Sequence, residues 1–181
     1  HINGFTALEV PEAAGGSGSH SRSTCGGCRR WDLRLCRGTA AQILDDEIRA
    51  VLCPDKISIE ECLEVHCTSP GVGLRSNMTM VFRAIDGLSI GAHHMLRAQE
   101  LQRGTGGFTE FVGLPFVHMA APIYRTGRAR RGPMCAKQCW STPLHGRLPR
   151  DIPNVQASWI TLGTDGVRQM LAAGSNDLGA P

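Results

Sequence analysis

Residues 106–133 carry the side chains best suited to chemistry. The sequence GGFTEFVGLPFVHMAAPIY, followed by RTGRARRGP, places a carboxylate (Glu110), an imidazole (His118) and a phenol (Tyr124) around a proline-containing apolar loop. An ionisable pair that flanks such a loop can hold the polar edge of a small ring, because buried polar groups need partners. A short β-prone run followed by a long polar loop is typical of the C-terminal end of a strand in an α/β barrel.

The elements that must position these residues alternate along the chain. Two-residue periods predict strands at 2–10, 74–82, 108–112 and 154–160, with a further start at 176–178. Apolar stripes and caps predict helices at 39–52, 58–68, 89–103 and 164–173. This alternation predicts an α/β fold with a parallel sheet. We expect a partial TIM-like (β/α) barrel with about four strands, a single domain over residues 1–181 and an interior part of a larger barrel.

Two stretches break the pattern and are expected to be irregular. Residues 11–37, which include GGSGSHSRSTCGGCRR, have neither period nor apolar face, and prolines and a glycine interrupt residues 135–150. Their composition resembles a GC-rich gene read in the wrong frame, so a non-catalytic relic stays open as an alternative. In the helix at 89–103, Met95 and Leu96 are expected to face inwards, and His93 and His94 to lie at the surface.

Composition excludes several classes of protein. The formal net charge of +3 is too diluted along the 181 residues to indicate a nucleic-acid partner. Apolar runs stay well short of the roughly 18 residues of a membrane span, and the N-terminal sequence lacks the features of a signal peptide. We therefore expect a cytoplasmic protein with no membrane partner.

Eight cysteines raise the question of metal or disulfides. Without a signal peptide, reduced thiols or metal ligands are the expected states. Cys25 and Cys28 have the spacing of half a zinc site, which the irregularly spaced Cys62, His66 and Cys67 could complete. A small zinc-stabilised binding module is therefore a second alternative, with unligated cysteines as the simpler interpretation. The pair at 135 and 139 begins an iron–sulfur spacing that lacks its third cysteine.

The loop GGFTEFVGLPFVHMAAPIY with RARRGP closely resembles FO synthase, in the half that joins tyrosine to a ribityl-diaminouracil. The resemblance also covers HINGFTALEV, GTAAQILDDEIRAVLCPDKI, GLRSNMTMVF, LRAQELQ, NVQASWITLGTDG and AAGSNDLG, in the family's order. Related radical enzymes of the menaquinone pathway share only part of these motifs and are a third alternative.

The resemblance implies a radical S-adenosylmethionine transferase of deazaflavin (coenzyme factor-420) biosynthesis. In that family a 4Fe-4S cluster cleaves S-adenosylmethionine, and the hydroxybenzyl part of tyrosine is coupled to 5-amino-6-ribitylaminouracil. A cyclising second half or subunit is the implied protein partner. The family's cluster-binding Cys-x3-Cys-x2-Cys is expected upstream of this chain, and none of its eight cysteines takes that place. We therefore expect no metal ligands here, and a chain that is inactive alone.

Site residues follow from the strand ends and the resemblance together. We expect four residues to contact S-adenosylmethionine: Glu9, Arg75, Asn77 and Thr79. Five are expected to contact the substrates: Glu110, His118, Gln156, Ser158 and Asp177. Competing interpretations make Glu9 a loop cap, Arg75 a solvated charge at a strand entry and His118 an ordinary loop histidine.

Overall fold

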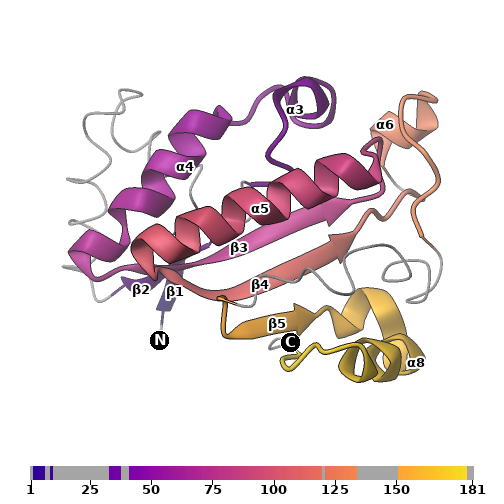
Figure 1. The fold of residues 1–181 in the computed structure, drawn as a ribbon. Helices are drawn as coiled ribbons and strands as arrows, with labels where there is room; N and C mark the ends of the chain where they lie inside the picture. Colours follow the sequence, from indigo (N-terminus) through magenta and orange to yellow (C-terminus); the bar gives the residue numbers. More distant parts are fainter. Residues whose placement is uncertain are drawn as a thin grey trace.

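The computed structural model describes residues 2–6, 9, 33–37, 41–119, 121–133 and 151–178. Five parallel strands form one sheet in chain order: β1 (Ile2–Thr6), β2 (Leu33–Arg37), β3 (Arg75–Phe82), β4 (Phe108–Pro115) and β5 (Asn154–Ala157) (Figure 1). A parallel bridge from Gln156 to Asp177 continues the order beyond β5, as predicted for 176–178. The predicted α/β class with a parallel sheet is confirmed, and the carboxyl ends of these strands all lie at one edge.

From β2 onward, the helices in the described part of the chain lie between successive strands, and one follows β5. They are α3 (Asp46–Leu52), α4 (Ile59–Thr68), α5 (Leu88–Thr105), α6 (Pro122–Arg125) and α8 (Trp159–Ala172), with a short 3-10 helix at Pro70–Val72. Figure 1 shows α4 and α5 lying over one face of the sheet, and α8 beyond β5. None of the described helices is long and apolar enough to cross a bilayer.

Helix α4 begins and ends where the sequence indicates. Ser58 and Glu61 form a complete capping box: the Ser58 side chain accepts from the Glu61 N–H, and the Glu61 carboxylate accepts from the Ser58 N–H at 2.8 Å. Pro70 starts the 3-10 turn that follows the helix. A Cβ on Gly107 would overlap the Pro70 ring, so this glycine allows the start of β4 to approach the turn before β3.

Helix α5 extends slightly further than predicted, and the burial of two of its side chains differs from the prediction. It ends at Gly106 (φ 62°), in the left-handed region that favours glycine, and not at Gly104. Met95 is buried as expected, but Leu96 is 53% exposed. The prediction that His94 lies at the surface is wrong. Its ring is fully buried because Nδ1 accepts the Leu44 N–H at 3.0 Å and the ring contacts a β4 phenylalanine edge-on.

Three further boundaries were predicted wrongly. Residues 33–37, expected to be irregular, form β2, which pairs with strands on both sides. Helix α3 begins only after Asp45, whose carboxylate accepts the Ile48 N–H at 3.0 Å, and not after Thr39. Strand β5 ends at Ala157, so Ser158 is the N-cap residue and Trp159 the first residue of α8, which has a break at Gly163 (φ 64°). The irregular stretch at 135–150 lies outside the described residues.

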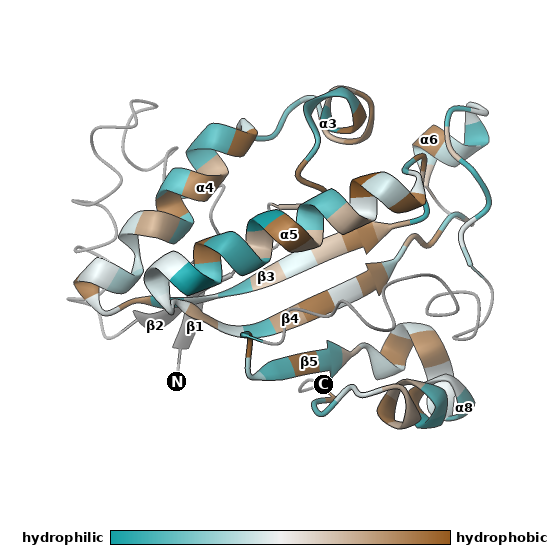
Figure 2. Cartoon of the chain, viewed as in Figure 1, coloured by the Kyte–Doolittle hydropathy of each residue, from teal (hydrophilic) through white to brown (hydrophobic). Residues whose placement is uncertain are grey.

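The core lies between the sheet and its helices. Met78 and Met80 of β3, Phe108 and Phe111 of β4, and Val65 of α4 are each at most 1% exposed. Figure 2 shows hydropathy rising along β3, from its hydrophilic start to its hydrophobic carboxyl end. This packing fixes the direction and register of β3 and β4, and so the places of their polar side chains.

Candidate functional site

A row of polar side chains crosses three adjacent strands. The Glu110 carboxylate of β4 accepts from Asn77 Nδ2 of β3 at 2.9 Å and from Gln156 Nε2 of β5 at 3.1 Å. Register aligns Asn77 directly with Glu110, and Gln156 lies opposite Val112, two residues further along β4. Strand alternation places these three residues on one face, while Met78, Phe111 and Val155 take the other. Three expected site residues are therefore in contact.

Glu110 is half-buried and its two carboxylate oxygens are each held by an amide. Charge-assisted hydrogen bonds of this kind restrict the rotamers of all three side chains. Both amides donate to Glu110, so each points its carbonyl oxygen away from it. Glu110 therefore holds the two amide side chains in fixed orientations.

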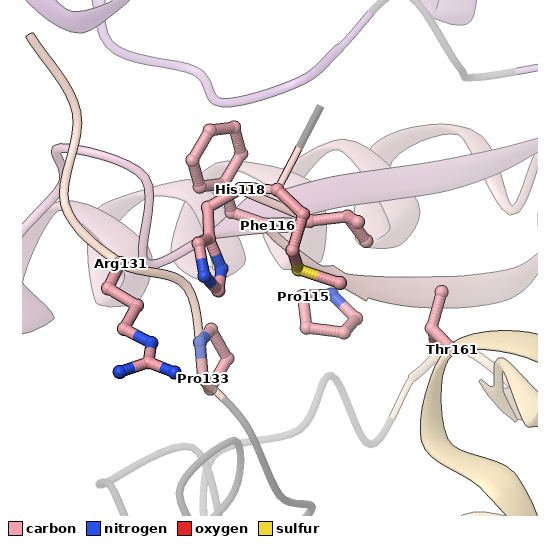
Figure 3. A pocket seen from close by; sticks show the side chains of 8 residues that line it. Pro115, Phe116, His118, Arg131, Pro133 and Thr161 are labelled. Carbon is pink, nitrogen blue, oxygen red and sulfur yellow. The ribbon is translucent and has the colours of Figure 1, made fainter. Parts of the chain in front are cut away.

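A cavity of about 260 Å³ lies at the carboxyl end of β4 (Figure 3). Its lining comes from the loop after β4, the turn before residue 134 and the first turn of α8, and comprises Pro115, Phe116, Val117, His118, Met119, Arg131, Pro133 and Thr161. Figure 3 shows the His118 ring beside Arg131 and Pro133. The cavity thus joins an apolar wall to a cationic group, at the edge where ligands bind in parallel α/β sheets.

His118 is held from two sides. Its ring is 7% exposed, and Tyr124 of α6 lies edge-on to it with ring centroids 4.8 Å apart. The Gly132 N–H donates to Nδ1 at 3.2 Å, which leaves the proton of the neutral ring on Nε2. His118 therefore presents a donor whose orientation is set by its neighbours.

Residues 130–132 form a strap across the carboxyl ends of β3 and β4. The Arg130 N–H donates to the Ala84 carbonyl at 2.8 Å, and Gly132 contacts His118 as described. A Cβ at Gly132 would overlap the Phe116 carbonyl oxygen, so only glycine allows this approach. The strap places Arg131 at the mouth of the cavity.

The carboxyl end of β3 is fixed by a residue that sequence reasoning missed. Asp86 is 4% exposed, and its two oxygens accept the N–H groups of Arg83 (3.0 Å) and Ala84 (2.9 Å). Arg83 has φ 69°, a strained conformation that this carboxylate stabilises. An aspartate before a glycine directly after a strand was the available signal.

The remaining expected cofactor residues are spread widely. Thr79 is buried two residues beyond Asn77, on the same face of β3. Arg75 is exposed at the amino end of β3, about 23 Å along the strand from the carboxyl edge. Glu9 is exposed after β1 and accepts the Thr6 N–H at 2.5 Å, as a loop cap does. Arg75 lies two residues before Asn77, on the same face of β3.

The two other expected substrate residues lie around β5. Ser158 is half-buried and precedes α8, without a side-chain capping bond. Asp177 is half-buried, and its carbonyl accepts the Ala157 N–H at 2.8 Å. Ser158 follows Gln156 by two residues in the chain and precedes Thr161, which lines the cavity. Asp177 lies opposite Gln156 in the sheet.

Cys62, His66 and Cys67, suggested to complete a zinc site, do not form a group that could hold a metal ion. Cys62 and His66 are buried in the core, and burial raises the pKa of the Cys62 thiol to about 11. His66 Nδ1 lies 3.1 Å from the Ser76 hydroxyl, whereas Cys67 is exposed. In the described ranges no three His, Cys, Asp or Glu side chains form a group that could hold a metal ion. The pairs at 25 and 28 and at 135 and 139 lie outside those ranges.

Comparison with known proteins gives a match over almost the whole chain. The FO synthases of Nocardia farcinica and Streptomyces coelicolor are 41% and 39% identical over 184 and 180 residues, which is 99% of this chain and 21% of each relative. The 5-amino-6-(D-ribitylamino)uracil--L-tyrosine 4-hydroxyphenyl transferase of Methanothermobacter thermautotrophicus is 39% identical over 180 residues, 99% of this chain and 49% of that protein. No family model matches the chain.

The match runs through both stretches that were expected to be irregular, since it leaves out only about 1% of the chain. The chain spans about a fifth of the length of these FO synthases and about half of the length of the archaeal transferase. The resemblance to FO synthase is confirmed, and the alternatives of a zinc module or a menaquinone-pathway enzyme are not favoured.

Proposed function

We infer that this chain is a segment of an FO synthase and forms part of the barrel in which tyrosine is coupled to 5-amino-6-ribitylaminouracil. The observation that carries the proposal is the 39–41% identity over 99% of the chain to proteins of that name and to the tyrosine transferase. A relative that carries only the transferase name matches as well as the FO synthases, which favours the tyrosine-coupling half.

The strand order supports a barrel. All five strands are parallel and follow the chain order without a reversal, which is the order of a (β/α)8 barrel; a doubly wound sheet reverses at a switch point. In such a barrel the face opposite the helices becomes the interior. We propose one partial barrel domain, with Asn77, Glu110 and Gln156 on the interior face.

The polar row suits a heterocycle rich in N–H and C=O groups. The amide oxygen of Gln156 is oriented by Glu110 and can accept from ring or exocyclic N–H groups. Ser158 and Asp177 extend this polarity around β5. We propose that Glu110, Gln156, Ser158 and Asp177 orient the aminouracil, while the loop that holds His118 contacts the second substrate.

The cofactors of the complete enzyme divide between this chain and the rest of the protein. The described residues contain no metal-holding group, so they do not fit a 4Fe-4S cluster, and its ligands are proposed to lie elsewhere in the protein. S-adenosylmethionine fits better, since Asn77 and Thr79 are buried polar groups of the proposed interior. When bound, it would supply the group that initiates reaction at tyrosine; Asn77 and Thr79 would hold it and keep water out.

The test is coupling by the full-length protein that contains this segment. With the cluster reconstituted, the product of tyrosine and the aminouracil is measured by mass spectrometry. Glu110→Ala releases both amides and is expected to lower kcat/KM by about 100-fold, since two charge-assisted hydrogen bonds are lost. The control Glu100→Ala, on the exposed side of α5, should retain full activity.

A wild-type protein that makes no coupled product, or a Glu110→Ala variant as active as wild type, would overturn the proposal. Metal analysis separates the zinc alternative: iron with acid-labile sulfide supports the transferase, and one tightly bound zinc contradicts it. The proposed location stays the cytoplasm, with a cyclising half or subunit as protein partner, and fractionation and co-purification test these two.

A further inference from the structure

The residues that line the cavity at the carboxyl end of β4 indicate the class of ligand that it binds. Only the identification of that ligand as tyrosine rests on the proposed function. We propose that it binds a single aromatic ring that bears a carboxylate, with Arg131 and His118 holding the carboxylate. In the proposed enzyme that ligand is tyrosine. The polar row around Glu110 is left for the other substrate.

The charge of the cavity comes from Arg131. The strap of residues 130–132 is fixed at Ala84 and at His118, so the backbone of Arg131 is held while its side chain stays exposed at the cavity. Among the residues described, no carboxylate forms an ion pair with Arg131. A guanidinium fork matches a carboxylate with two parallel hydrogen bonds, so an unpaired arginine at a cavity selects this group.

The second donor is His118. Because Gly132 occupies Nδ1, the neutral ring donates only through Nε2, and Tyr124 limits ring rotation from the other side. A donor beside a guanidinium favours an anionic oxygen over a second cation. The Thr161 hydroxyl in the lining can serve the amino group or the ring hydroxyl of the same ligand.

The size and walls of the cavity select a single ring. Its volume of about 260 Å³ lies just under the range of sites for drug-sized ligands, which begins at about 300 Å³. Pro115, Phe116 and Met119 provide apolar and aromatic surface for one ring, and Met119 is 72% exposed and able to adapt.

The test measures binding to the full chain by calorimetry with three probes: L-tyrosine, 3-(4-hydroxyphenyl)propionate and tyramine. Tyramine has the ring but no carboxylate. Wild type should bind the two carboxylates at least about tenfold more tightly than tyramine. Arg131→Gln should weaken both carboxylates by about 10- to 100-fold and leave tyramine unchanged.

Matched control variants distinguish loss of a contact in the cavity from a change in overall charge or a loss of folding. Arg128→Gln removes an exposed arginine of the same turn that does not line the cavity, and should change the Kd values by less than about twofold, because exposed charges are screened. His118→Asn keeps an acceptor for Gly132 but loses the Nε2 donor, so it should weaken the carboxylates, whereas His93→Asn should not. Circular dichroism confirms that each variant is folded.

The outcomes distinguish this inference from the proposed function. If tyrosine binds and Arg131→Gln leaves its Kd unchanged, or weakens tyramine equally, the cavity is not the carboxylate site although the function stands. If only the propionate binds, and Arg131→Gln abolishes it, the cavity site stands and tyrosine is not its ligand. Binding of none of the three probes overturns the inference about the cavity, while the coupling assay with the full-length protein tests the function separately.

Discussion

Two buried histidines predict a loss of stability in mild acid. His66 of α4 and His94 of α5 are at most 1% exposed, and in each ring Nε2 has no hydrogen-bond partner among the residues that the structure describes. Burial lowers the pKa of His66 to about 4; burial, then the positive charges of Arg97 and Arg49, lowers the pKa of His94 to about 3. Both rings are therefore neutral in the folded chain throughout the range where free histidine titrates.

The sign and size of the effect follow from proton linkage. Below the ordinary pKa of 6.5 the unfolded chain binds protons that the folded chain refuses, so the free energy of unfolding falls as pH falls towards the folded pKa values. At about pH 5 each ring costs roughly 2 kcal/mol, and the pair roughly 4 kcal/mol. This is a large part of the roughly 5–15 kcal/mol that stabilises a typical domain.

The assay is urea unfolding followed by circular dichroism at about pH 7.5 and about pH 5. The double variant His66→Asn, His94→Asn keeps acceptors near Ser76 and Leu44 but cannot be protonated, so its loss between the two pH values should be smaller than that of wild type by roughly 4 kcal/mol. His93→Asn, at an exposed position of α5, should lose as much as wild type. Equal losses in wild type and the double variant would refute the buried-histidine account.

Two further predictions test the close approach of Gly132 to the loop after β4 and the burial of the Cys62 thiol. Gly132→Ala forces a Cβ against the Phe116 carbonyl oxygen, so it should lower the free energy of unfolding in urea by about 1–3 kcal/mol and weaken tyrosine binding. The control Gly104→Ala changes a helical position with open space around it and should be neutral or stabilising. Similar losses of stability in both variants would contradict the strap geometry. Cys62, whose pKa is raised by burial, should resist alkylation in the folded chain while the exposed Cys67 reacts, and this difference should vanish in urea. Peptide mapping by mass spectrometry measures the labelling of each cysteine. Equal labelling of both in the folded chain would contradict the core packing.

Local signals in the sequence were sufficient for much of the helical structure. The capping box that starts α4 depends on residues three apart, and the contact that it predicts is present. Strand β2 had no such signal, since its neighbours in sequence are glycine- and serine-rich and its pairing partners β1 and β3 are distant in the chain. His94 was misplaced because helical periodicity places a residue on a face, while only tertiary packing decides that a polar ring there finds a partner.

The sequence was sufficient to predict those site residues that lie close together because their strands are neighbours in the sheet. Asn77, Glu110 and Gln156 were each expected at the site, and parallel pairing brings them together. Arg75 was expected on the same strand as Asn77 and lies two residues before it, at the exposed amino end of β3. Arg131 was not among the expected site residues, because the strap that carries it to the cavity depends on the approach of Gly132 to Phe116, which no sequence pattern expresses.

The central claim is that this chain provides a working segment of a tyrosine-coupling barrel. The most direct measurement replaces the aligned segment of the Methanothermobacter thermautotrophicus transferase, 49% of that protein, with residues 1–181 and assays the chimera for the coupled product by mass spectrometry. The account predicts product that depends on tyrosine and is lost in the Glu110→Ala chimera. A chimera that folds and retains its iron yet forms no product would contradict it.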